Sequence, residues 1–241
     1  MSIHLIGGGR DEAQTAALLA SFVAESISAA KTVDPVIALL LVLEPEDQTS
    51  VDRFTRVLVR AGAPASSIRL HAITEGERFD ATAVAGAHGV FVGGGLTPAY
   101  LDALVGIAEE IRWRIANGAP YAGFSAGAAV AATRALIGGF LLDGRVVSPE
   151  EAAEDLEAVA VRDGLGLVEA TLDVHAAQWG TLSRLVAVVD SGLAESGAAI
   201  DEHTALVVDG SHSTIMGAGQ VWRAERIASS VAVSPQRASA P

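Results

Sequence analysis

Short apolar runs alternate with longer stretches of helical period through the first half of the chain. This alternation predicts an α/β fold in which helices cover both faces of a mostly parallel sheet. The expected strands are residues 3–6, 35–43, 68–72, 89–92 and 121–123. The expected helices are residues 11–30, 47–61 and 98–116.

The pattern changes in the second half of the chain. Residues 138–162 mix glycines and acidic residues without a clear period, so we expect a loop with a short helix. Apolar runs at 205–208 and 220–222, separated by turn signals, predict antiparallel strands at one edge of the sheet. We expect a single domain over residues 1–227. The small, polar tail 228–241 is expected to be disordered.

Composition narrows the classes of function. The chain has 241 residues, half of them hydrophobic, which suits one substantial core. A formal net charge of −13 argues against nucleic acid as a partner, and Arg53, Arg56 and Arg60 are spaced like the solvated face of a helix. The absence of cysteine excludes disulfides, thiolate zinc sites and a cysteine nucleophile.

We expect neither a secretory signal peptide nor a membrane-spanning segment in this sequence. The first residues lack the basic start and apolar stretch of a signal peptide. No apolar run approaches the ~20 residues that a membrane-spanning helix needs. We therefore expect a cytoplasmic protein without a membrane partner.

Ser125 is the candidate nucleophile. It stands in Gly-Phe-Ser-Ala-Gly, between an expected strand and an expected helix, which is the setting of a nucleophile elbow. A serine on such a sharp turn projects from the carboxyl edge of the sheet, and the amide of Ala126 can stabilise a developing oxyanion. The alternative is that Ser125 only caps a helix.

A base and an acid are available at the ends of two other apolar runs. His175 follows the run 166–174, and a base at the end of one strand can face a nucleophile at the end of a neighbouring strand. Asp201 and Glu202 follow a further run. Because adjacent strand residues point in opposite directions, only one of these two acids can face His175.

These segments together resemble the serine-peptidase family of cyanophycinases and aspartyl dipeptidases. The similarity extends from the first expected strand to the last and rests on five motifs in the same order. They are the glycines 7–9, the glycines 93–95 after a strand, the Gly-x-Ser-Ala-Gly-Ala run 123–128, the Asp-x-His segment from 173 to the Arg-Leu pair 184–185, and Ile-Asp-Glu-x-Thr-Ala at 200–205.

The resemblance implies a serine-type peptidase with a flavodoxin-like fold, shared with class I glutamine amidotransferases, that acts on a small peptide. The order Ser, His, Glu differs from that of the α/β-hydrolases. A homodimer is also compatible with the family. The implied roles are Ser125 as nucleophile, His175 as general base and then acid, Glu202 as the orienter of the imidazole, and the amides of Gly94 or Gly95 and of Ala126 as the oxyanion hole.

The expected substrate pocket departs from that of the family. Cyanophycinases carry a glutamine just before the histidine and arginines soon after it, where this chain has Val174, Trp179 and Thr181. Since carboxylate recognition usually relies on bidentate arginine, we do not expect cyanophycin as the substrate, and we expect a more apolar pocket. Trp179 either lines this pocket or packs as core. The candidate substrate-binding residues are Asp173, Trp179, Arg184 and Thr97, the last of which keeps half of an Asn-Thr pair found in aspartyl dipeptidases.

Other functions remain open. A non-catalytic relative that binds a small molecule would explain the altered pocket, and the same triad chemistry would serve an esterase or amidase. The glycines 7–9 do not make a dinucleotide site, because Glu12 stands where the third glycine belongs. The Asp173-x-His175 and Glu202-His203 pairs could hold zinc in principle, but the elbow would then be unexplained. We expect neither a metal nor a cofactor.

Overall fold

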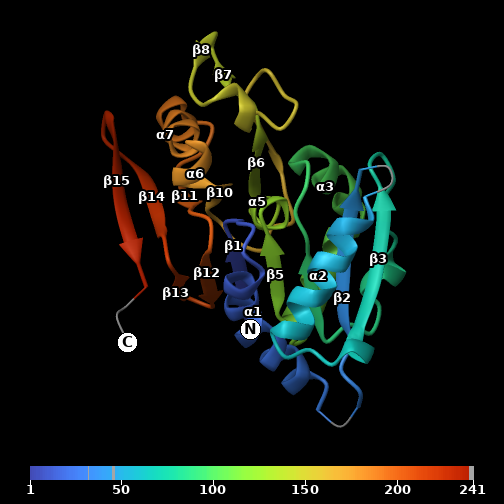
Figure 1. Cartoon of the computed structure of the whole chain (residues 1–241). Helices are drawn as coiled ribbons and strands as arrows, with labels where there is room; N and C mark the ends of the chain where they lie inside the picture. The colour runs from blue at the N-terminus through green and yellow to red at the C-terminus, as the bar shows by residue number, and fades with distance from the viewer. Residues whose placement is uncertain (32, 45–46, 239–241) are drawn as a thin grey trace.

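The centre of the molecule is a seven-stranded sheet with the order β13-β12-β1-β5-β4-β2-β3 (Figure 1). The computed structural model describes residues 1–31, 33–44 and 47–238. The five strands β1-β5-β4-β2-β3, in their order in the sheet, run parallel to their neighbours. At the edge next to β1, β12 and β13 add antiparallel pairs. The strands are β1 Ser2–Ile6, β2 Ile37–Leu43, β3 Ile68–Thr74, β4 Gly89–Val92, β5 Tyr121–Phe124, β12 Thr204–Asp209 and β13 His212–Gly217.

The two faces of this sheet are covered by different helices, because successive side chains of each strand point to opposite faces. Along β2, Leu39 and Leu41 pack with α1 and α2, whereas Ala38 and Leu40 pack with α3 and α4. The strands β1, β4 and β5 are buried along their whole length because the sheet lies between two helical layers. These helices are α1 Glu12–Ala29, α2 Gln48–Arg60, α3 Thr97–Leu104 and α4 Ala108–Ala116.

The expected helix 98–116 is interrupted. It divides into α3 and α4 around a 3-10 turn, Val105–Ile107. The glycine at 106 lies in this turn, and glycine is a poor residue for a helix interior. Further helices are short or belong to the second half of the chain: α5 Ala126–Ala129, α6 Ala176–Trp179 and α7 Leu182–Ser191.

A second sheet has the order β10-β11-β14-β15 and packs against α7 through Leu185, Val188 and Ala199. The expected strand 220–222 belongs to this sheet and not to the edge of the large one. Its strands are β10 Thr171–Val174, β11 Ser196–Ile200, β14 Gln220–Ile227 and β15 Ser230–Arg237. The hydropathy pattern located the strand but could not tell which backbone it pairs with.

The expectation of a disordered tail over residues 228–241 is corrected for the part that forms β15. This strand pairs antiparallel with β14 from Ile227↔Ser230 to Gln220↔Arg237. Its side chains are mostly exposed, so the backbone ladder holds it in place and not a buried face. Order that depends on backbone pairing alone leaves no apolar pattern in the sequence, so the polar composition of this segment did not predict it. Residues 239–241 lie outside the described residues.

The segment 138–162 is more regular than the expected loop with a short helix. It contains a projecting hairpin and a short 3-10 helix, and its last strand, β9, pairs with β6 (Figure 1). The elements from β6 onward are β6 Arg134–Gly138, β7 Leu141–Leu142, β8 Arg145–Val146, the 3-10 turn Glu150–Ala152 and β9 Ala160–Asp163.

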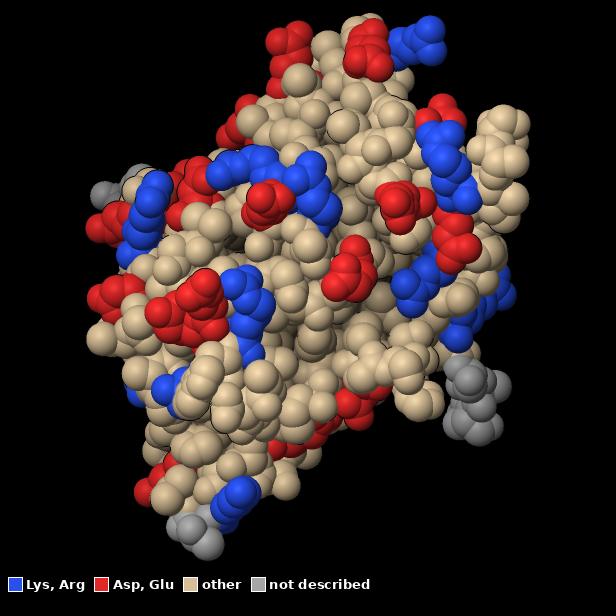
Figure 2. Space-filling view, turned by 180° about the vertical axis from the view of Figure 1, so that it is seen from behind, with Lys and Arg blue, Asp and Glu red and all other residues tan. Residues whose placement is uncertain are grey.

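Charged side chains are dispersed over the face of the molecule that Figure 2 shows. On the face shown in Figure 2, the basic side chains are scattered among acidic ones. Within the part of the chain that the structure describes, no helix has the length and apolar character needed to cross a bilayer.

Candidate active site

The chain turns sharply at Ser125, between β5 and α5. Ser125 has φ 52° and ψ −110°, a conformation that non-glycine residues rarely adopt. Side chains at the two flanking glycines would not fit: a Cβ at Gly123 would collide with the carbonyl of Gly127, and one at Gly127 would collide with that of Val92. The glycine spacing of the sequence motif is therefore required by the close packing of the elbow.

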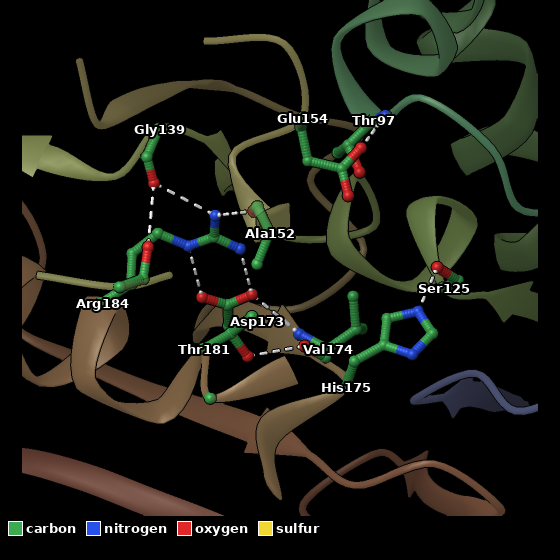
Figure 3. A network of polar contacts seen from close by, with 12 residues as sticks. Thr97, Ser125, Gly139, Ala152, Glu154, Asp173, Val174, His175, Thr181 and Arg184 are labelled. Atoms are coloured by element: carbon green, nitrogen blue, oxygen red, sulfur yellow. Dashed lines mark hydrogen bonds and ion pairs between the residues drawn. The ribbon is translucent and has the colours of Figure 1, made fainter. Parts of the chain in front are cut away.

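Three side chains from separate elements form one hydrogen-bonded chain. The Ser125 Oγ lies 2.8 Å from His175 Nε2, and His175 Nδ1 lies 2.7 Å from Glu202 Oε1. His175 follows the last residue of β10, and Glu202 follows β11, the parallel neighbour of β10. Figure 3 shows the His175 ring facing Ser125. Neutral His175 with its proton on Nδ1 would donate to Glu202 and accept from Ser125.

The electrostatic environment suits a base. Burial lowers the pKa of His175, and the hydrogen bond and charge of Glu202 oppose that shift. The imidazole is consequently neutral near pH 7 and can accept the serine proton. The same carboxylate can stabilise the imidazolium that proton transfer would create.

Asp201, the other acid of the pair, faces away from the histidine. Its carboxylate accepts hydrogen bonds from the backbone amides of Ala177 and Gln220 and from the indole nitrogen of Trp222. Asp201 thus holds the surrounding loops together, and Glu202 is the residue that contacts His175.

The expected oxyanion-hole residues lie beside Ser125. A Cβ at Gly94 would come within 3.0 Å of the Ser125 Cβ, so this backbone passes close to the serine. Among the described residues, the amides of Gly94, Gly95 and Ala126 donate to no protein acceptor. They are therefore available to an oxyanion.

A cleft of about 560 Å³ opens over Ser125. The sequence led us to expect a pocket more apolar than that of the family, but many of the lining residues are charged, and all of these except Glu202 lie outside the five motifs. The charged lining residues are Arg10, Glu44, Arg53, Glu150, Glu151, Glu154, Asp155 and Glu202, and the others are Gly9, Gly94, Gly95, Leu96, Phe124, Ser125, His175 and Trp179.

Of the four candidate substrate-binding residues, only Trp179 lines this cleft, with 42% of its surface exposed and its ring stacked on His175. Asp173 and Arg184 are buried and form an ion pair, with the Arg184 Nε and Nη2 donating to the two carboxylate oxygens (Figure 3). Arg184 Nη1 donates to the carbonyls of Gly139 and Ala152. These donors are already used, so Arg184 does not face a substrate.

Thr97 is likewise buried outside the cleft lining. Its backbone amide donates to Glu154 Oε2 over 2.8 Å, so Glu154 caps the first turn of α3, where the N-cap residue Leu96 offers no side-chain acceptor. Burial raises the pKa of Glu154. The bond fixes the segment that follows Gly94 and Gly95 to the wall of the cleft.

Sequence reasoning missed the purpose of the glycine run 7–9. A Cβ at Gly8 would collide with the His175 ring, and one at Gly9 with the His203 ring. The His175 amide also donates to the carbonyl of Gly7 over 3.0 Å. The run itself was the signal, but only the structure identifies the histidine that it accommodates.

No metal site accompanies this arrangement in the described part of the chain, where no three His, Asp or Glu side chains gather as ligands. His175 and Glu202 contact each other, but Asp173 is bonded to Arg184, so the Asp173-x-His175 and Glu202-His203 pairs do not form one set of ligands.

Comparison with known proteins finds similarity to peptidases. The model of peptidase family S51 matches residues 42–216. The crystal structure of a peptidase from an acI-B1 Actinobacterium superposes with a TM-score of 0.69 at 21% identity, covering 98% of this chain and 94% of that chain. A candidate peptidase E protein from Listeria monocytogenes EGD-e gives a TM-score of 0.58 at 16% identity, covering 90% of this chain and 98% of that one. No curated protein matches the chain.

Proposed function

The chain belongs to peptidase family S51, and we propose that it is a serine-type peptidase that hydrolyses an amide bond of a small peptide. In this proposal Ser125 is the nucleophile, His175 the general base and then acid, and Glu202 the residue that orients the imidazole. The observation that carries the proposal is the continuous hydrogen-bonded chain from Ser125 Oγ through His175 to Glu202, on a strained elbow at the floor of a cleft.

The reaction begins when His175 Nε2 takes the proton of Ser125 and the serine oxygen attacks the peptide carbonyl. The amides of Ala126 and of Gly94 or Gly95 donate to the resulting oxyanion, and Glu202 stabilises the imidazolium. His175 then gives its proton to the leaving amine as the carbon–nitrogen bond breaks. Water hydrolyses the acyl-enzyme by the same steps, with His175 again as the base.

Positioning supplies much of the expected rate. One donor of an oxyanion hole typically contributes about 100- to 1000-fold, and its effect depends on being fixed before the reaction. Here Ala126 begins α5, and Gly94 is held against the elbow. These two amides therefore lie beside Ser125 before a substrate binds.

The test is the intact mass of the protein after exposure to a fluorophosphonate, which phosphonylates activated serines. We expect one adduct on the wild type and none on Ser125→Ala, with His175→Ala and Glu202→Gln reacting more slowly. Circular dichroism of each variant checks that the fold is retained. An unlabelled, well-folded wild type would contradict the proposal and favour the non-catalytic relative that binds a small molecule.

A further inference from the structure

Glu154 links two segments of the cleft lining that lie far apart in the sequence. Its Oε2 accepts a hydrogen bond of 2.8 Å from the backbone amide of Thr97, 57 positions earlier in the chain. Figure 3 shows the carboxylate directed at Thr97. Glu154 itself lines the cleft, as do Gly94 and Gly95. The contact therefore joins the segment 138–162 to the segment that carries these two expected oxyanion-hole amides.

The backbone that carries Glu154 is held in a rare conformation. Glu154 and Asp155 both have φ 57°, in the left-handed region that non-glycine residues seldom adopt. Each such residue costs about 1–3 kcal/mol and persists only where surrounding contacts fix it. Here the Gly139 amide donates to the Ala153 carbonyl over 2.8 Å, and a Cβ at Gly138 would lie 2.5 Å from the same carbonyl oxygen. The turn at Glu154 is thus packed against the end of β6.

The buried pair of Asp173 and Arg184 anchors the same turn. Arg184 Nη1 donates to the carbonyl of Gly139 over 3.2 Å and to that of Ala152 over 2.6 Å. Burial raises the pKa of Glu154, whereas the charge of Arg184 opposes that shift and the charge of Asp173 adds to it. A series of polar contacts therefore extends from β10 through α7 and Glu154 to the start of α3 (Figure 3).

The segment on the other side of this contact passes close to Ser125, since a Cβ at Gly94 would come within 3.0 Å of the Ser125 Cβ. The hydroxyl of Tyr100 donates to the Gly94 carbonyl over 3.3 Å, which holds the start of the segment. The N-cap residue Leu96 makes no side-chain hydrogen bond. Glu154 therefore fixes the end of the segment, in the first turn of α3.

We propose that Glu154 is a positioning residue: by holding the Thr97 amide, it keeps the amides of Gly94 and Gly95 in place for the oxyanion that forms when Ser125 attacks. This proposal rests on the proposed peptidase function. Donors of an oxyanion hole are effective because they are fixed before the reaction, and a misplacement of about 1 Å can cost about 100-fold in rate. Glu154 acts through the backbone of α3 and does not touch the reacting atoms.

The experiment compares two probes of otherwise identical structure, a fluorophosphonate with a P=O group and its thio analogue with a P=S group. In both reactions the Ser125 oxygen displaces fluoride from phosphorus. The phosphoryl oxygen accepts hydrogen bonds from the oxyanion hole, whereas sulfur is a weak acceptor. The ratio of the two second-order rate constants therefore reports hydrogen bonding in the oxyanion hole, and intact mass follows both reactions on the full-length protein.

The variants separate the Thr97 contact from a general loss of stability. Glu154→Met and Glu154→Ala remove the acceptor, the first with most of the side-chain length retained, whereas Glu154→Gln keeps an oxygen that can accept from the Thr97 amide. Asp80→Ala is the matched control. The Asp80 carboxylate accepts from the Thr82 amide over 2.8 Å at the start of the 3-10 turn Ala81–Val84, and Asp80 is not among the described residues that line the cleft.

We expect Glu154→Met and Glu154→Ala to react with the oxygen probe about 10- to 100-fold more slowly than the wild type, because the oxyanion donors are displaced. Their reaction with the sulfur probe should slow much less, so the oxygen-to-sulfur ratio should fall by about 10-fold. Glu154→Gln and Asp80→Ala should keep the ratio of the wild type. Circular dichroism and urea unfolding identify the variants that are folded.

Three results would overturn the role of Glu154 while leaving the peptidase proposal intact. The first is an unchanged ratio in folded Glu154→Met or Glu154→Ala, whether or not both rates fall together. The second is a ratio in Glu154→Gln as low as in the other two variants. The third is that neither Glu154→Met nor Glu154→Ala folds, which would make the residue necessary for the fold. If the wild type reacts with neither probe, the proposed function itself fails, and the role of Glu154 fails with it.

Discussion

The indole of Trp179 lies parallel to the imidazole of His175, with the ring centroids 3.8 Å apart and an interplanar angle of 6°. The Trp179 amide donates to the His175 carbonyl over 2.8 Å in the single turn of α6, which places both rings on one side of the chain. The imidazole is thus covered by the indole on one face while Gly8 packs against it elsewhere. An aromatic face favours the charged imidazolium.

Trp179 should report the protonation of its neighbour. The emission of the wild type is expected to fall as the pH drops and His175 becomes charged, because a stacked imidazolium quenches indole fluorescence. His175→Ala and Trp179→Phe should lack this transition. Trp113 and Trp222 remain in both variants, and their emission is not expected to follow His175. Trp179→Leu should lower kcat roughly 3- to 30-fold, as loss of a cation–π contact implies. A transition that persists in Trp179→Phe would contradict this reading.

The pH profile of peptide hydrolysis should follow His175. Burial lowers its pKa, and only the neutral imidazole can take the serine proton, so kcat/KM is expected to fall as the pH drops through a value below 6.5. Glu202→Gln removes the group that opposes the shift. The acidic limb should therefore move to lower pH in this variant, and kcat should fall by about 100- to 10000-fold. If the acidic limb of the Glu202→Gln profile did not move, Glu202 would not influence the pKa of the base.

Gly8 and Gly62 provide a matched pair. Both have positive φ, 108° and 105°, but a Cβ at Gly8 would meet the His175 ring, whereas one at Gly62 has nothing within 4 Å. Gly8→Ala should displace the imidazole and lower kcat/KM by about 100-fold. Gly62→Ala should cost about 1 kcal/mol of stability and leave activity unchanged. Equal activities in the two variants would show that His175 tolerates the extra methyl group.

The elbow should store strain that glycine can release. Ser125→Gly and Ser125→Ala are both expected to be inactive and differ only by a methyl group. Because a non-glycine residue in such a conformation costs about 1–3 kcal/mol, Ser125→Gly should unfold at a higher denaturant concentration than Ser125→Ala. Urea unfolding of the two proteins measures the difference, and equal midpoints would mean that the turn is unstrained.

The buried pair of Asp173 and Arg184 should be structural. Arg184→Met leaves an uncompensated carboxylate and is expected to cost about 3–5 kcal/mol of unfolding free energy, whereas Asp173→Leu/Arg184→Met should recover part of this loss. Arg134→Met breaks the exposed pair with Asp163 and should change stability by at most about 1 kcal/mol. If Arg184→Met kept full stability but bound peptides poorly, the earlier expectation of a substrate contact would regain support.

The sequence by itself determined the order of strands and helices in the first half of the chain and the elbow around Ser125. These features depend on local spacing: apolar periodicity identifies strands and helices, and small residues on either side of one serine identify a tight turn. Apolar runs also placed His175 and the Asp201-Glu202 pair at strand ends, and the family resemblance singled out Glu202. Their catalytic roles stay a proposal, although the structure brings the three side chains into hydrogen-bonding contact.

Only the tertiary structure decided which distant residues complete the cleft. Helical spacing placed Arg53 on a charged face, but packing of α2 against the sheet turned it toward Phe124. Asp173 and Arg184 looked like recognition residues until their burial showed them bonded to each other. Similarly, β15 is ordered by its pairing with β14, despite a polar sequence. A local pattern specifies a backbone conformation, whereas contacts between segments far apart in the chain depend on how the elements pack, which no single segment encodes.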